Sequence, residues 1–309
     1  MTEIGLLHTE GRNPASVDLD LLSAAEIVAL MNREDATVAK AVAAALPQVA
    51  MAVDCAAQAL RAGGRILYAG AGTSGRLGVL DAAECRPTFG VSDSQVIGLM
   101  AGGASAFTRA QEGVEDAQEA GSRDARSLNL TAHDVLIALS ASGRTPYAIG
   151  ALVAARQAGS KTVAVACNRN AVMSAWADIA IEVDTGPEIL TGSTRLKAGT
   201  AQKMVLNMIS TGAMVRSGRV YENWMVDMLP SNEKLIDRAE RMIEEITGTT
   251  REQAAVLLRD AHYQVKSAIV MGLLGISYEA AGVRLQGADG FVRGALEVLS
   301  QPLTDDHTG

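Results

Sequence analysis

The pattern of apolar and polar residues divides the chain into three stretches. Residues 16–61 carry apolar side chains at helical spacing, and Ser23 with Glu26 three positions later fits a capping box at a helix start. Five short apolar runs then alternate with helical segments, and from about residue 231 only helical spacing remains. We expect an N-terminal helical segment over 1–54, an α/β domain over 55–230 and a small helical domain over 231–309.

The five apolar runs predict the strands of a sheet, at residues 66–69, 95–101, 134–142, 161–168 and 177–186. Nearly continuous apolar strands separated by helices are typical of a parallel sheet that is covered on both faces. We therefore predict a doubly wound, parallel five-stranded sheet in flavodoxin-like order. In such a sheet the ligand binds outside the carboxyl ends of the strands, at the switch point of the strand order.

Two loops at this switch point are rich in glycine and hydroxyl side chains. The first strand leads into GAGTSGR, residues 70–76, and the third leads into SASGRTP, residues 140–146. Each loop offers backbone N–H groups, hydroxyls, an arginine and a helix N-terminus, and these groups favour an anion. The residues that we expect to bind it are Gly72, Thr73, Ser74, Ser140, Ser142, Gly143 and Thr145.

The first loop also matches the G-x-G-x-x-G fingerprint of dinucleotide-binding folds. That fingerprint requires an acidic residue about 20 positions further on, at the end of the second strand, to hold the ribose. Here that strand ends in LMAGGASAF, which has no acidic residue. A single phosphate monoester therefore fits the two loops better than a dinucleotide, while the plainest alternative is a pair of structural Gly-rich turns.

Composition limits the partners and the location of the protein. A formal net charge of −8 and only 3% aromatic residues disfavour a nucleic-acid partner. Cys55, Cys85 and Cys167 are scattered, as are the four histidines, so we expect neither disulfides nor a metal site. Because no apolar run reaches the 18 residues of a membrane span and the N-terminus lacks a signal-peptide pattern, we expect a cytoplasmic protein without membrane contact.

Several long motifs resemble one protein family. The loop SASGRT resembles the S-x-S-G-x-T phosphate loop of sugar isomerase (SIS) domains. One branch of these, the N-acetylmuramic acid 6-phosphate etherases, is similar to GAGTSGRLGVLDAAEC and to TGPEILTGSTRLKAGTAQKMVLNMIS at 185–210. Four further stretches resemble the same family and occur in the same order: LHTEGRNPASVDLD, MNREDATVAKAV, EGVEDA and ENWMVDM. The resemblance therefore covers nearly the whole chain. One departure is Cys85-Arg86-Pro87, where the family commonly has Cys-Pro-Pro.

The resemblance implies cleavage of the lactyl ether of a sugar phosphate, by elimination and then addition of water, with no metal or redox cofactor. Glu84 and Glu115 match the catalytic glutamates of the family. Glu84, at the end of the helix that follows the first loop, would protonate the departing lactate and is a candidate for the base at C2. Glu115, on a helix after the second strand, would be the second acid or base and would activate the water. Asp81 and Asp116 are neighbouring competitors.

The long motif before the last helix of the domain suggests further substrate contacts. The residues concerned are Glu188, Ser193, Thr194, Arg195 and Lys197. The alternative is an ordinary helix start with Ser193 or Thr194 as its cap. In related SIS proteins a partner subunit helps to build the site, so the resemblance also implies a homodimer.

The tail resembles the ubiquitin-associated-like ending of the same family. Thr250 or Thr249 fits a helix cap, and we expect His262 and Lys266 to lie on the surface.

Two rival functions remain: a sugar-phosphate isomerase, which would use the same loops, and a non-catalytic sugar-phosphate sensor. Release of lactate separates an etherase from both.

Overall fold

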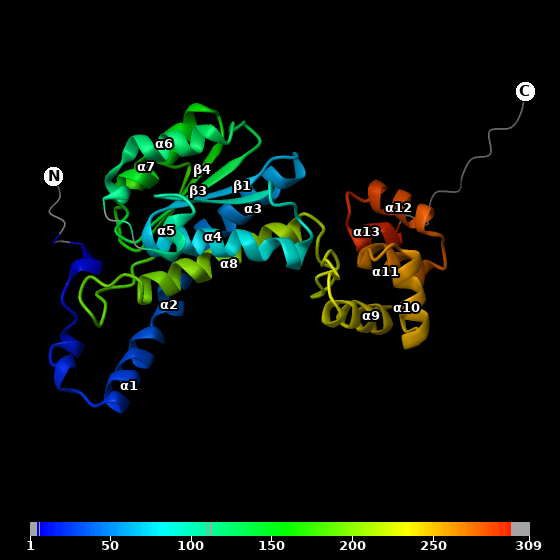
Figure 1. Cartoon of the computed structure of the whole chain (residues 1–309), viewed down its shortest axis with the longest axis horizontal. Coiled ribbons are helices and arrows are strands. Elements are labelled where there is room, and N and C mark those ends of the chain that lie inside the picture. Colours follow the sequence, from blue (N-terminus) through cyan, green and yellow to red (C-terminus); the bar gives the residue numbers. More distant parts are fainter. Residues whose placement is uncertain (1–4, 6, 110, 112, 298–309) are drawn as a thin grey trace, which may run out of the picture. The chain divides into compact units, whose positions relative to one another are not determined.

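The computed structural model describes residues 5, 7–109, 111 and 113–297. By its contacts the chain divides into two compact units, Met1–Glu84 with Ser92–Ala213, and Cys85–Val91 with Met214–Gly309 (Figure 1). The second unit thus takes in a short segment from the middle of the chain as well as the tail. The extreme ends of the N-terminal and C-terminal regions predicted above, at 1–4, 6 and 298–309, lie outside the described residues.

The N-terminal segment is helical, as predicted. Its elements are three 3₁₀ turns, η2 (His8–Glu10), η3 (Pro14–Ser16) and η4 (Leu19–Leu21), followed by α1 (Ala24–Asp35), α2 (Val38–Ala43) and α3 (Leu46–Arg61). The capping box at the start of α1 is confirmed, since the Ser23 hydroxyl accepts the Glu26 N–H and the Glu26 carboxylate accepts the Ser23 N–H.

The five predicted strands form one parallel sheet in the order β2-β1-β3-β4-β5, which confirms the doubly wound, flavodoxin-like arrangement. The strands are β1 (Ile66–Gly70), β2 (Val96–Met100), β3 (Val135–Ser140), β4 (Lys161–Ala166) and β5 (Ile179–Glu182). The order reverses beside β1, which pairs with β2 on one side and with β3 on the other. Gly70 lies opposite Leu139, so the first and third strands end side by side.

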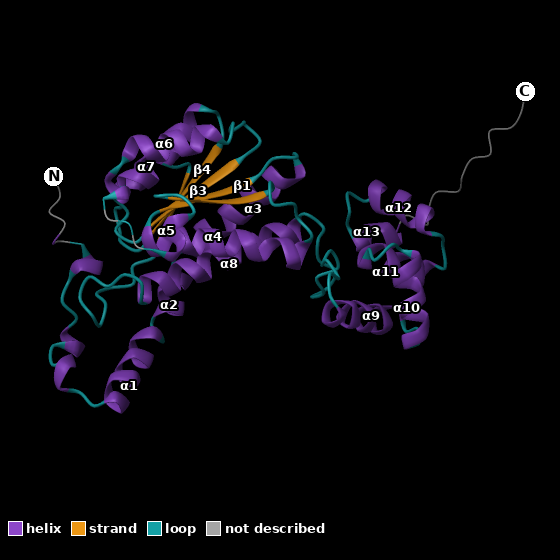
Figure 2. Ribbon diagram, in the orientation of Figure 1, coloured by secondary structure: helices purple, strands orange, loops and turns teal. Residues whose placement is uncertain are grey.

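Helices cover both faces of the sheet (Figure 2). The helices of this part of the chain are α4 (Gly72–Phe89), α5 (Ser105–Thr108), α6 (Gln118–Ser127), α7 (Pro146–Gln157) and α8 (Lys197–Arg216), with 3₁₀ turns η5 (Val114–Asp116) and η6 (Val172–Trp176). Leu67 and Leu136 share a buried cluster with Leu152 of α7. Tyr68, the next residue along β1, points the opposite way and donates its hydroxyl hydrogen to Asp81 of α4. The sheet is therefore buried on both sides, as its continuous apolar strands predict.

The second unit is helical. Its elements are α9 (Glu233–Thr247), α10 (Arg251–Asp260), α11 (Val265–Leu274), α12 (Tyr278–Gly287) and α13 (Val292–Glu297). The cap at Thr250 is confirmed, because its hydroxyl accepts the Gln253 N–H. His262 is exposed as predicted, but the surface position predicted for Lys266 is wrong. Only 13% of the Lys266 side chain is exposed, and its Nζ lies 2.7 Å from Asp227 Oδ2, because that carboxylate compensates for burial of the cation.

Candidate active site

The first glycine-rich loop is short, because α4 begins only two residues after β1 ends. Gly72 starts the helix with a φ of +55°, and Thr73 and Ser74 follow in its first turn. The first four N–H groups of an α-helix have no acceptor within the helix, so this end attracts an anion. The Arg76 side chain, which we expected near the anion, donates to the carbonyl oxygens of Ala106 and Phe107, both at 2.8 Å. It therefore connects the start of α4 to α5.

The second loop places three hydroxyl groups together. Ser140 Oγ lies 2.8 Å from Thr145 Oγ1 and 3.2 Å from Ser142 Oγ, and it accepts the Gly143 N–H at 3.0 Å. Thr145 stands at the N-terminus of α7 without capping it by its side chain, and Pro146 begins the helix. Since β1 and β3 are neighbours, the structure brings both predicted anion-binding loops to the same edge of the sheet.

Glu115 lies beside the first loop, in a short 3₁₀ helix that follows the second strand and α5. It belongs to the single 3₁₀ turn η5, which follows Gly113 in a left-handed conformation. Val114 of this turn packs on the buried cluster of Ala71, Ala101 and Tyr147, which joins the first loop to the start of α7. The exposed Glu115 side chain therefore stands at the margin of the two loops.

Glu84 is not brought to the loop of its own chain. We predicted that α4 ends at Glu84, but the helix continues to Phe89, with Pro87 in its last turn. Glu84 is exposed and lies 12 positions after Gly72, which corresponds to about 18 Å along the helix axis. The departure from the family pattern, Cys85-Arg86-Pro87, thus lies within a helix and not in a loop.

Asp81, one turn before Glu84, is buried and held by hydrogen bonds within the chain. It is 5% exposed, and its carboxylate accepts hydrogen bonds from Tyr68 Oη (2.8 Å), Asn207 Nδ2 (2.9 Å) and Ser210 Oγ (3.1 Å). Burial raises the pKa of Asp81, and these three donors partly oppose the rise. Asp81 therefore ties α4 to β1 and α8, whereas the other competitor, Asp116, is exposed on η5.

The motif before α8 holds an internal cap. Glu188 is fully buried, and its carboxylate accepts the N–H groups of Lys197 (2.9 Å) and Ala198 (3.0 Å). Glu188 therefore caps α8. The alternative cap at Ser193 or Thr194 is wrong, because the Glu188 carboxylate already accepts the N–H groups at the start of the helix. Ser193 and Thr194 are half-buried, and Arg195 is exposed, on the preceding loop.

Lys197 is also engaged within the chain. Its ammonium group is buried and lies 2.7 Å from Glu34 Oε2 of α1, and this hydrogen bond lowers the pKa of Glu34. Asn13 donates a second hydrogen bond, of 2.8 Å, to the same oxygen. Nothing in the local sequence pattern around Glu34 indicates this contact, which joins α1 to the start of α8. Substrate binding by Glu188 and Lys197 stays a prediction.

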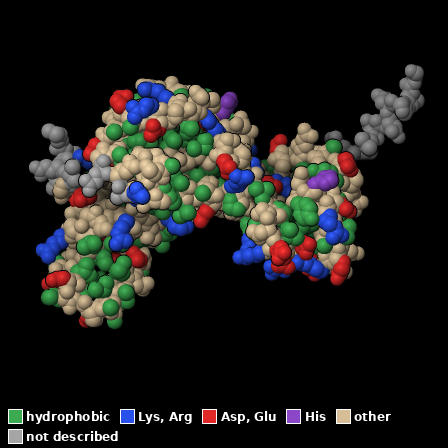
Figure 3. All heavy atoms as spheres, in the orientation of Figure 1, with side chains coloured by type: hydrophobic (Ala, Val, Ile, Leu, Met, Phe, Trp, Pro, Cys, Tyr) green, Lys and Arg blue, Asp and Glu red, His purple; other side chains and the backbone are tan. Residues whose placement is uncertain are grey.

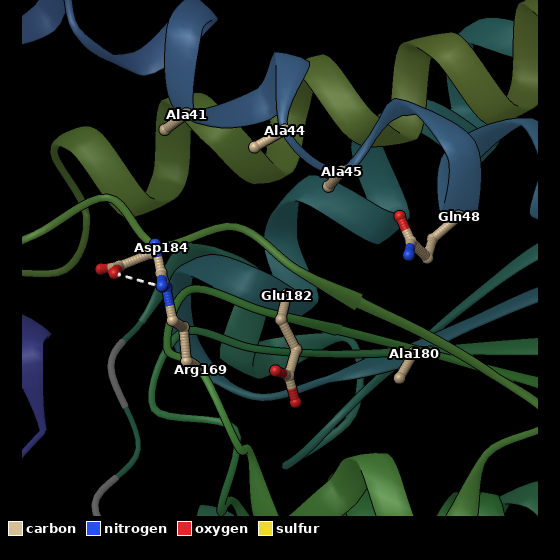
Figure 4. Close-up of a pocket in the computed structure, with 8 residues that line it drawn as sticks. All are labelled: Ala41, Ala44, Ala45, Gln48, Arg169, Ala180, Glu182 and Asp184. Carbon is tan, nitrogen blue, oxygen red and sulfur yellow. Dashed lines mark ion pairs between the residues drawn. The ribbon is translucent and has the colours of Figure 1, made fainter.

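A cavity of about 440 Å³ lies at the β5 edge of the sheet, away from the predicted residues (Figure 4). It is lined by Ala41, Ala44, Ala45, Gln48, Arg169, Ala180, Glu182 and Asp184. Arg169 pairs with Asp184 at 3.0 Å, as the dashed line shows, and Glu182 accepts the N–H groups of Asn170 and Ala171. These charges are compensated within the chain, so the cavity offers less to an anion than the two loops do.

Neither a metal-binding cluster nor a membrane-spanning helix is found in the part of the chain that the structure describes. There, no group of three or more His, Cys, Asp or Glu side chains is placed to hold a metal ion. No single helix of those residues has both the length and the apolar character to cross a membrane. None of the three cysteines, which all lie among the described residues, forms a disulfide, and Cys85 and Cys167 are buried.

Known proteins resemble the chain over nearly its whole length. A family model described as the glucokinase regulatory protein N-terminal SIS domain matches residues 48–156. The N-acetylmuramic acid 6-phosphate etherase of Salmonella agona is 58% identical over 294 residues, which are 95% of this chain and 99% of that protein. The protein of the same name from Salmonella typhimurium is 57% identical over the same shares.

Solved structures resemble part of the chain at low identity. A phosphoheptose isomerase from Francisella tularensis matches 63% of this chain and all of its own, with 13% identity and a TM-score of 0.47. A phosphoheptose isomerase from Neisseria gonorrhoeae matches 60% of this chain and 99% of its own, with 19% identity and a TM-score of 0.45.

Proposed function

This chain belongs to the N-acetylmuramic acid 6-phosphate etherases, and from that premise we propose how its residues bind the substrate and share the reaction. It is a carbon–oxygen lyase that cleaves the lactyl ether of N-acetylmuramic acid 6-phosphate. The isomerase and the sugar-phosphate sensor are not favoured, because the identity to named etherases extends over 95% of the chain. We further propose a cytoplasmic role in peptidoglycan recycling, since N-acetylmuramic acid is a peptidoglycan sugar.

The phosphate is bound by the two loops at the ends of β1 and β3. Backbone N–H groups of the first turn of α4 and the hydroxyls of Thr73 and Ser74 face it from one side, and Ser140, Ser142 and Thr145 face it from the other. This juxtaposition of two hydroxyl-bearing loops at one sheet edge is the observation that carries the proposal. Ser193, Thr194 and Arg195 contribute from the loop before α8.

The reaction requires proton transfer at two positions. In the open-chain sugar the C1 aldehyde acidifies the C2 proton, so that a base removes it and lactate leaves from C3. An acid protonates the departing ether oxygen, so that D-lactate is released, and water then adds across the double bond to give N-acetylglucosamine 6-phosphate. Glu84 serves the leaving group and is the candidate base at C2, while Glu115 activates the water.

A homodimer reconciles this division of labour with the geometry. Glu84 lies about 18 Å along α4 from the anion-binding end of that helix, further than a sugar phosphate bound there extends. A second copy supplies its own Glu84 to the site that holds the phosphate and Glu115. Large apolar side chains are exposed on the N-terminal segment of the single chain, including Leu21 (77%) and Val28 (62%), and Figure 3 shows hydrophobic side chains gathered there.

Release of D-lactate tests the proposed assignment. The purified protein should release D-lactate and N-acetylglucosamine 6-phosphate in equal amounts from N-acetylmuramic acid 6-phosphate. Glu84→Gln is nearly isosteric but carries no exchangeable acid proton, so kcat should fall about 10²- to 10⁴-fold while substrate binding is kept. Glu115→Gln should still release lactate in the first turnover if its main task is water addition.

Deuterium exchange at C2 separates the two roles of Glu84. If Glu84 removes the C2 proton, incorporation of solvent deuterium must fall together with turnover in Glu84→Gln. Undiminished exchange would assign the C2 base to another residue and limit Glu84 to the leaving group. Full lactate production by Glu84→Gln would exclude it from the mechanism.

A further inference from the structure

Gln202 on α8 has a buried side-chain amide whose nitrogen makes no hydrogen bond to the described residues. The side chain is 1% exposed, and its Oε1 accepts the hydroxyl hydrogen of Ser74 at 3.0 Å. Its Nε2 is buried and has no hydrogen-bond partner among the described residues. Buried amide N–H groups are nearly always paired, so a second orientation of the amide, in which this donor has an acceptor, needs to be considered.

The position of Gln202 links it to the anion-binding end of α4. Ser74 is in the first turn of that helix, next to the proposed phosphate. One turn earlier on α8, Gly199 lies against the same loop, since a Cβ placed on it would stand 3.5 Å from Thr73 Cγ2. The turn of α8 over 199–202 therefore backs the first loop directly.

We propose that Gln202 is a positioning residue that sets the direction of the Ser74 hydroxyl when the phosphate binds; this rests on the proposed function of the two loops. While Ser74 donates its hydrogen to Gln202 Oε1, it has none to give to a phosphoryl oxygen. Rotation of the amide by 180° makes Nε2 the donor to Ser74 Oγ and frees the hydroxyl hydrogen for the anion. The amide oxygen and nitrogen occupy nearly the same space, so the two orientations fit the same site.

The phosphate selects between the two orientations. Without an anion, Ser74 satisfies Oε1 and leaves Nε2 unpaired; after rotation Nε2 is paired and Oε1 gives up its donor. The two orientations therefore use the same number of hydrogen bonds within the Gln202–Ser74 pair. An acceptor oxygen beyond Ser74 adds a bond in the rotated orientation alone, and this differential contact shifts the population towards it.

Gln202→Glu tests the proposal, because an ionised carboxylate only accepts and holds the Ser74 hydrogen. We expect the Kd of inorganic phosphate, measured by calorimetry, and the KM of the sugar phosphate to rise about 10-fold or more at pH 8 while kcat changes much less. The defect should shrink as the pH falls, since the protonated carboxyl of this variant is again a donor. In the Ser74→Ala background this pH-dependent defect should disappear, whereas repulsion between the carboxylate and the phosphate would persist there.

A double-mutant cycle separates action through Ser74 from direct binding. Gln202→Leu should weaken phosphate binding in the native background but add nothing to the effect of Ser74→Ala. An equal loss in both backgrounds, or no loss in either, would overturn the proposal. If Gln202→Leu does not fold, the pH dependence of Gln202→Glu with and without Ser74→Ala decides alone. Because phosphate binding is measured without turnover, failure of the wild-type protein to release lactate would count against the proposed function and not against Gln202.

Discussion

Among single residues, two glycines of the loops that we propose to bind the phosphate differ in what a side chain would meet. Both have a positive φ, +55° at Gly72 and +72° at Gly143. A Cβ on Gly143 would stand 2.4 Å from the Cβ of Ala171, whereas a Cβ on Gly72 meets no atom within 4 Å. Gly143 is thus required for both its conformation and its lack of volume, and Gly72 for its conformation alone.

The pair predicts two different costs for the same substitution. Gly72→Ala should lower the free energy of unfolding by about 1–2 kcal/mol, the cost of a left-handed non-glycine residue. Gly143→Ala should lower it by about 1–3 kcal/mol more, because the loop must move away from Ala171. Urea unfolding followed by circular dichroism measures both. Equal losses for the two variants would show that the contact with Ala171 relaxes freely.

Between elements, a charged pair joins the starts of β1 and β3, at the end of the sheet opposite the two glycine-rich loops. Asp134 accepts hydrogen bonds from Arg65 Nε (3.0 Å), Nη2 (2.7 Å) and its backbone N–H (2.9 Å). Only 1% of the Asp134 side chain is exposed. Burial by itself raises the pKa of Asp134, but the bonds from Arg65 and Thr131 lower it below its ordinary value.

This pKa shift makes part of the stability depend on pH. Because the pKa is lowered by folding, the stabilisation is present above the ordinary pKa of about 3.9 and is lost as the pH falls through the folded value. Asp134→Asn should lower the free energy of unfolding by about 3–5 kcal/mol at pH 7, and by less at pH 3. Asp237→Asn, at an exposed carboxylate that pairs with Arg241 and Arg251, is the control and should cost about 1 kcal/mol or less. A loss for Asp134→Asn that is independent of pH would contradict this account.

For the whole molecule, the proposed dimer makes a prediction that a single chain cannot satisfy. If Glu84 of one protomer serves the site that contains Glu115 of its partner, a hybrid of Glu84→Gln and Glu115→Gln has one intact site and one doubly altered site. Mixing the two inactive variants under exchange conditions should then restore about a quarter of the wild-type rate, because half of the dimers are hybrid and each has one working site of two. Glutamates acting within one chain would restore none.

The dimer itself is measured by light scattering after size-exclusion chromatography. We expect twice the mass of one chain. Leu21→Glu and Val28→Glu, on the exposed apolar N-terminal segment, should shift this mass towards the monomer and reduce lactate release together. The single-chain mass for the wild-type protein would refute both the dimer and the sharing of Glu84.

The sequence by itself determined the elements and the loops. Apolar runs predicted all five strands, Ser23 and Thr250 marked two helix starts, and glycines with hydroxyls marked the two loops that we propose to bind the phosphate. These features depend on residues close together in the chain, and local periodicity and capping chemistry record them directly. The family motifs likewise identified the reaction.

Only the tertiary structure decided which distant side chains meet. It placed Glu188 on the N-terminus of α8, Lys266 against Asp227, and Gln202 behind Ser74, and it separated Glu84 from the first loop by the length of a helix. Such contacts join residues up to 128 positions apart in the chain. No spacing rule links them, because they depend on how the helices pack across the sheet and not on the periodicity of any one segment.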